Sequence, residues 1–130
     1  MQQADKQKYL TIALYVFGII YLIGVPVLMM GLEASGWTWT PRQPEYEQMI
    51  MGVYATLGVF LIMAAKNPAE HASLIWFTVW SNIVHGGIML AHSIIDETER
   101  SNLAGDVPAL FIVALILWYL MPGKGEAAGD

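Results

Sequence analysis

Six side chains that could hydrogen-bond or bind a metal lie at helical spacing in one apolar segment, Trp76 to Asp96. They recur at alternating steps of three and four residues, which places them on one face of a helix. We call this face the polar stripe; it comprises Thr78, Asn82, His85, Met89, His92 and Asp96. The segment is long enough to cross a membrane. Because lipid cannot hydrate polar groups, we expect the stripe to face other helices or a wet cavity.

His85 lies near the middle of this segment and is its main candidate for chemistry. A structural His would be neutral and hydrogen-bonded to Asn82, Thr78 or a carbonyl of a neighbouring helix. A functional His would bind haem, another tetrapyrrole or a metal, or would relay protons. Gly86-Gly87 directly after it would offer a flat surface to a ring, but close helix packing explains the same pair.

The other candidate cofactor ligands are Asn82, Met89 and His92. His92 follows His85 by seven residues, about 10.5 Å along a helix, so the two cannot bind one ion without distortion. They could serve two separate centres or a relay through water. Copper is a minority interpretation, because the methionines form no tight cluster with His and Met is common in apolar packing.

A second possible site combines one imidazole with three carboxylates at the same expected membrane depth. It comprises His92, Asp96, Glu47 and Asp106, a set that suits a divalent metal ion or a proton-loading group. The structural alternative is that Asp106 caps a helix, Glu47 favours a helix N-terminus and Asp96 is solvated. His71 is expected at the surface.

The composition predicts an all-α integral membrane protein. The 130 residues are 56% hydrophobic and 13% charged, against about 25% charged in average globular proteins. Uncharged blocks predict a four-helix transmembrane bundle of up-down topology, with a tail over residues 1–8 and spans over 9–32, 47–65, 68–96 and 107–121, and with a disordered tail over 123–130. A cleaved signal peptide is the rival interpretation of the first block, but that block is longer than such peptides require.

Local signals place the ends and turns of these spans. Pro26 predicts a kink or a locally opened turn in the first span. Asn67, Pro68 and Glu70 predict a capped helix start after a very short turn, so the second and third spans should be antiparallel neighbours. Tyr54 on the second span could then reach the polar stripe.

The charges suggest an orientation and exclude some partners. Lys6, Lys8, Lys66 and Lys124 fall on one side, and Arg42 and Arg100 fall on the other. The positive-inside rule therefore predicts an inner-membrane, multi-pass protein with both termini in the cytoplasm. The net charge of −5 and the absence of a basic patch argue against nucleic acid. The absence of Cys excludes disulfides and thiolate metal sites.

Three motifs of the second to fourth spans resemble one family: YATLGVFLIMAAKNPAEHASLIWFTVWSNIVHGG, the pair Glu99-Arg100, and GDVPAL at residues 105–110. The family is a group of small bacterial four-helix membrane proteins of unknown function, DUF6632, and the likeness covers roughly residues 47–122. Its pattern also carries His followed by small residues at the position of His85, whereas an amide is more usual at that of His92. The resemblance implies fold and topology, a family-level role for His85, and no reaction.

Three functions remain open on these grounds. The leading one is a non-enzymatic accessory or structural subunit that packs with copies of itself or with a larger membrane complex, since small residues recur on the helix faces and little of the chain lies outside the membrane. The second is a bundle that binds a tetrapyrrole or a divalent metal through the third-span histidines. The third is a proton-coupled transporter of a small solute. The sequence contains no nucleophile-and-base set and no phosphate-binding loop that would suggest an enzyme.

Overall fold

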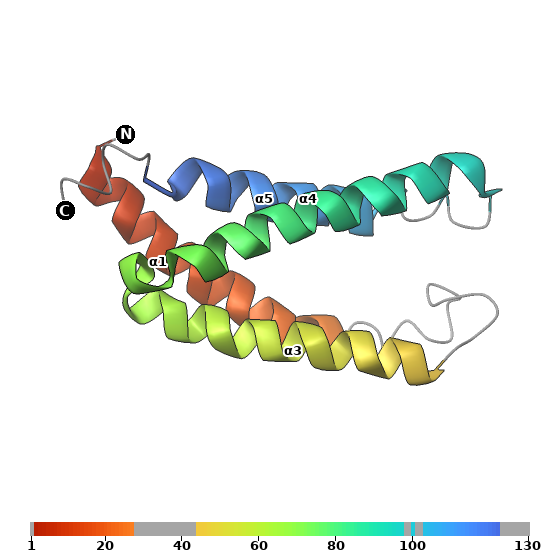
Figure 1. Cartoon of the computed structure of the whole chain (residues 1–130), viewed down its shortest axis with the longest axis horizontal. Helices are drawn as coiled ribbons and strands as arrows, with labels where there is room; N and C mark the ends of the chain where they lie inside the picture. Colours follow the sequence, from red (N-terminus) through yellow and green to blue (C-terminus); the bar gives the residue numbers. More distant parts are fainter. Residues whose placement is uncertain (1, 28–43, 98–99, 101–102, 123–130) are drawn as a thin grey trace.

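The computed structural model describes residues 2–27, 44–97, 100 and 103–122, without the side chains of Pro44 and Glu47. Every regular element within these residues is helical. The elements are α1 (Gln3–Ile19), the π-helix η1 (Ile20–Gly24), α3 (Pro44–Lys66), the 3-10 helix η3 (Pro68–His71), α4 (Ala72–Ile95) and α5 (Asp106–Leu120). The long helices alternate in direction (Figure 1). The prediction of an all-α, four-helix, up-down fold is confirmed.

The long helices form two antiparallel pairs, α1 with α3 and α4 with α5. Figure 1 shows that the pairs meet at the end where both termini and the α3–α4 turn lie, and that they diverge towards the other end. At the closed end, the Lys6 ammonium lies 5.0 Å above the ring of Tyr119 and links α1 to α5. The fully buried side chains come from all four helices and include Leu14, Leu61, Ile75, Val79 and Leu117.

The α1–α3 pair is held at one glycine crossing. A Cβ on Gly58 would lie 2.5 Å from the carbonyl oxygen of Gly18 and 2.6 Å from the backbone nitrogen of Leu22. A Cβ on Gly18 would lie 2.9 Å from the carbonyl oxygen of Gly58. The two backbones are therefore in contact, a distance that small residues alone allow. Gly52, another glycine of α3, has no atom within 4 Å of its Cβ position and takes no part in the crossing.

The first helix widens into η1 just before Pro26. Proline lacks a backbone N–H, and its ring collides with the carbonyl four residues earlier, here that of Leu22. The chain avoids this conflict with a π turn, in which the N–H of Val25 donates to the carbonyl of Ile20. Helical backbone then continues to Val27. The locally opened turn that Pro26 predicts is present.

Some helix ends differ from the sequence-based boundaries. The first helix begins at Gln3, not Tyr9, because the polar residues before Tyr9 are good helix formers and continue the same helix. Asn67 precedes α4 as expected but makes no side-chain cap; its carbonyl instead accepts from the N–H of Glu70 at 3.1 Å in a 3-10 turn. Asp106 is the first residue of α5 and Gly105 takes the N-cap position. The segment after Val27, with its Trp-rich loop, and the tail over 123–130 lie outside the described residues.

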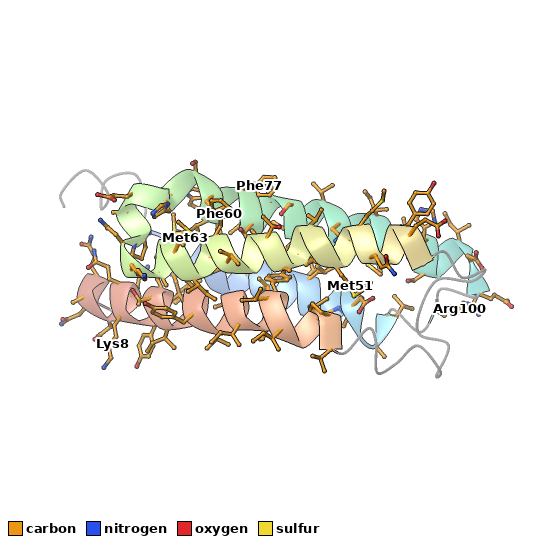
Figure 2. All side chains as sticks on the ribbon, turned by 90° about the horizontal axis from the view of Figure 1, so that it is seen from below. Lys8, Met51, Phe60, Met63, Phe77 and Arg100 are labelled. Atoms are coloured by element: carbon orange, nitrogen blue, oxygen red, sulfur yellow. The ribbon has the colours of Figure 1, made fainter. Side chains whose placement is uncertain are left out.

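The outer surface of the described helices is apolar. Gln3–Val27, Gln48–Lys66 and Pro68–Ile95 are long and apolar enough to cross a membrane, and the 15-residue α5 is shorter. Only 22–33% of the residues in the most apolar window of each span are buried inside the molecule. Exposed Phe60, Met63 and Phe77 belong to this surface, whereas the charged Lys8 and Arg100 lie at opposite ends (Figure 2). An apolar surface with charges at its ends indicates a membrane protein.

Candidate functional site

The polar stripe of α4 faces the α1–α3 pair and contacts it through two hydrogen bonds. The deeper bond runs from the Tyr21 hydroxyl to Oδ1 of Asn82, at 2.8 Å. The Asn82 side-chain amide in turn donates to the carbonyl of Thr78, at 2.6 Å. Tyr21 is 5% exposed and Asn82 is 3% exposed. Because an unpaired polar group costs free energy at this depth, the bond fastens the π turn of the first helix to α4.

The second bond joins the Tyr54 hydroxyl of α3 to Nδ1 of His85 of α4, at 2.6 Å. In the described part of the chain, the Tyr54 hydroxyl has no other acceptor and His85 Nε2 has no protein partner. Donation from Tyr54 to Nδ1 satisfies both groups and leaves the imidazole proton on Nε2, on the opposite edge of the ring. His85 is half-buried. The partner of His85 is therefore the hydroxyl of Tyr54, and not Asn82, Thr78 or a carbonyl of a neighbouring helix, which the sequence analysis expects for a structural His; the expected reach of Tyr54 to the polar stripe is observed.

Three nearly parallel rings from three elements form the centre of this contact. The ring centroids of Tyr21 and Tyr54 are 5.3 Å apart with planes at 15°, and those of Tyr54 and His85 are 6.0 Å apart at 8°. Asp106, at the start of α5, lies close enough to act electrostatically on Tyr54 and His85. We call Tyr21, Tyr54, Asn82 and His85 the aromatic–amide cluster. It joins the two helix pairs through buried and half-buried polar groups.

Exposure rises steadily along the polar stripe from the closed end of the bundle to the open end. Thr78 and Asn82 are buried, His85 and Met89 are half-buried, and His92 and Asp96 are exposed. The order follows the divergence of the two helix pairs in Figure 1. Only the deeper half of the stripe is therefore covered by protein.

The predicted metal site is not assembled by the residues that the structure describes. No three His, Asp or Glu side chains among them lie together as a metal-binding group, so His92, Asp96 and Asp106 do not form one. The side chain of Glu47, the fourth member, lies outside the description. Asp96 ends α4 and Asp106 starts α5, and both have interactions within the protein.

A tetrapyrrole or metal on His85 stays a prediction. Of the two ring nitrogens of His85, Nε2 is the one without a protein partner in the described residues. If Nε2 bound iron, Nδ1 would carry the proton, and Tyr54 would have to accept from Nδ1–H instead of donating. The expected flat surface beside His85 is absent. A Cβ on Gly86 would lie 3.1 Å from the ring of Phe111 in α5, and Gly87 is open but on the opposite side of α4 from His85. The glycine pair thus serves helix packing and the outer surface.

Sequence reasoning singled out the stripe and the reach of Tyr54, and it missed the specific role of Tyr21. Tyr21 was one of six tyrosines with hydrogen-bonding potential. The signal that distinguishes it is Pro26 five residues later, because the π turn that proline favours includes Tyr21. π turns inside helices are frequent at functional sites.

The chain matches the model of a family of unknown function, DUF6632, over residues 4–129. The chain belongs to this family. The match extends the resemblance of residues 47–122 to nearly the whole sequence. No curated protein and no solved structure matches the chain. No function is established for DUF6632, so the aromatic–amide cluster and the surfaces of the helices are the features of this chain that bear on its function.

Proposed function

We propose that this DUF6632 protein is a non-catalytic integral protein of the bacterial inner membrane that packs with a second copy of itself through the outer side of α4. Three apolar spans support the membrane location. In the described residues, the end with the termini carries Lys6, Lys8 and Lys66, whereas the other end carries Arg100. The positive-inside rule then favours cytoplasmic termini.

The observation that carries the proposal is a second stripe on α4, on the side away from the aromatic–amide cluster. Its residues recur at steps of three and four and are all exposed. We call it the outer stripe; it comprises Phe77, Trp80, Val84, Gly87, Ala91 and Ile94. In water such a surface would be an aggregation hazard, and in a membrane it must meet lipid or another helix.

Two features of the outer stripe favour a helix over lipid. Gly87 and Ala91 are four residues apart, which is the small-xxx-small pattern of close helix pairs, and a Cβ on Gly87 would have no neighbour within 4 Å. Trp80 lies twelve residues after Pro68 and fifteen before Ile95, so its indole N–H is near the middle of the span. Trp normally lies at the headgroup level, where its N–H can be hydrogen-bonded.

A second copy is the partner that best fits this pattern. Copies inserted in the same orientation present α4 in parallel around a two-fold axis, and parallel helices are the arrangement in which the small-xxx-small motif brings two backbones together. The cluster residues would remain inside each copy as the link between its helix pairs. The cluster residues hydrogen-bond to one another, which agrees with a structural and non-catalytic role.

The test is the oligomeric state of the purified protein in mild detergent, by blue-native electrophoresis and mass photometry. We expect a dimer for the wild type, loss of the dimer in Gly87→Leu, and a normal dimer in Gly52→Leu. Gly52 is the matched control because it is an equally open helical glycine away from α4. A strictly monomeric wild type, or a Gly87→Leu variant that still dimerises, would overturn the proposal.

A further inference from the structure

The polar stripe of α4 presents unsatisfied polar groups at the depth of the membrane. In the described residues, Nε2 of His85 has no protein partner, and the imidazole of His92 has no hydrogen bond or ion pair, although the His92 carbonyl accepts from the N–H of Asp96. His85 lies ten residues before Ile95, which is about 15 Å along the helix, or half the thickness of a hydrocarbon core. Lipid chains cannot satisfy imidazole N–H groups at that depth. Something polar must therefore reach them.

The helix packing leaves the part of the polar stripe near the open end exposed. α3 packs chiefly against α1 and α4 chiefly against α5, so the side of α4 that bears His92 and Met89 is not sealed by α3. His92 is exposed, Met89 and His85 are half-buried, and Asn82 is 3% exposed. At the inner end of the stripe, the buried hydroxyl of Tyr21 donates to Oδ1 of the buried Asn82.

We propose that the polar stripe lines a water-filled crevice that enters from the end of the bundle bearing Asp96 and Asp106 and ends at His85. The crevice brings water, and with it protons, to the imidazole in the middle of the membrane. The inference rests on the membrane location proposed above but not on self-association.

The titratable groups around His85 come from every element packed near it. They are Tyr54 on α3, Tyr21 on η1, Asp106 on α5 and His92 on α4 itself. Because Tyr54 donates to Nδ1, the imidazole proton is on Nε2, and water at that edge of the ring would accept a hydrogen bond from it. A positive ring would carry a second proton on Nδ1, from which the Tyr54 hydroxyl would then accept, and the carboxylate of Asp106 would favour that charge. Access of water from one side is also what a proton-coupled transporter would require of this residue.

The absence of Cys makes the chain suited to single-cysteine labelling. The full-length variants Met89→Cys, His92→Cys and Val84→Cys are compared in membrane vesicles with a charged, membrane-impermeant thiosulfonate added on the side opposite the termini. The reagent attacks the thiolate, which forms in water and not in hydrocarbon, so we expect both crevice positions to react at least about tenfold faster than Val84→Cys. Val84 is a stringent control because it is 58% exposed in the isolated molecule, whereas Met89 is only half-exposed.

Each alternative outcome has a distinct meaning. If Met89→Cys and His92→Cys react as slowly as Val84→Cys, the crevice is absent although the helix is in the membrane. If Val84→Cys reacts as fast as they do, α4 is not embedded in lipid, and both the crevice and the membrane location are overturned. Labelling of the crevice positions only from the side of the termini would also refute the proposal, because it reverses the predicted entrance.

Discussion

The glycine crossing of α1 and α3 allows a sharp prediction about stability. In Gly58→Ala the new methyl group would start 2.5 Å from the carbonyl oxygen of Gly18, and an ordinary contact needs at least 3.4 Å. The gap must therefore widen by about 0.9 Å. The atoms in the way belong to the backbone of Gly18 in α1 and of Leu22 in η1, so no side chain can turn aside and the helix itself must move.

Overpacking of this kind costs about 1–3 kcal/mol, which corresponds to a loss of about 5- to 150-fold in the ratio of folded to unfolded protein. The control is Gly52→Ala on the same helix, where nothing lies within 4 Å of the new methyl group. There, alanine should be neutral or stabilising by up to about 1 kcal/mol, since glycine is the poorer helix former.

The assay is reversible unfolding by SDS in mixed micelles, followed by far-UV circular dichroism. We expect the Gly58→Ala midpoint to shift to lower SDS and the Gly52→Ala midpoint to stay or to rise. If Gly58→Ala is as stable as Gly52→Ala, α1 and α3 do not cross at this glycine, and the argument for the two helix pairs is wrong.

The remaining predictions concern the aromatic–amide cluster and use the same unfolding assay. Tyr54→Phe removes one interhelical bond to a half-buried His85 and should cost about 0.6 kcal/mol and at most about 1.7 kcal/mol; an unchanged midpoint would show that water replaces the bond fully. Tyr21→Phe leaves Oδ1 of the buried Asn82 without its donor and should cost more, about 1–3 kcal/mol; a smaller loss than that of Tyr54→Phe would contradict the order of burial. Pro26→Leu removes the cause of the π turn and should destabilise the protein by displacing Tyr21. Its effect and that of Tyr21→Phe should therefore be less than additive in a double-mutant cycle. Full additivity would show that the π turn does not position the hydroxyl of Tyr21 for its bond to Asn82.

The inward orientation of the polar stripe is predictable from sequence because two physical requirements coincide. Steps of three and four residues put Asn82 and His85 on one side of a helix, and the cost of polar groups in lipid turns that side towards protein. Tyr54 is a foreseeable partner because only a short turn separates its span from the span that bears His85. The bonds from Tyr21 to Asn82 and from Tyr54 to His85 agree with this logic.

The pairing of the helices is not predictable in the same way. The turn over residues 66–71 limits only the distance between the ends of α3 and α4, and beyond it the helices separate. What decides the pairs is which glycines meet a backbone: Gly58 meets Gly18, whereas Gly52 meets nothing. A sequence pattern marks all such glycines alike. The predicted metal site has the same difficulty. Its carboxylates lie at the ends of different helices, and spacing along the chain does not fix the distances between those helices.

Oxidative cross-linking of single cysteines in native membranes tests most directly whether α4 turns its polar stripe inwards and its outer stripe towards a second copy. Ala91→Cys lies on the outer stripe and Met89→Cys on the polar stripe, two residues apart and therefore on opposite sides of the helix. We expect Ala91→Cys to form a disulfide-linked dimer and Met89→Cys to remain monomeric under the same oxidant. Dimers from Met89→Cys and none from Ala91→Cys would reverse the assignment of the two faces and contradict the account.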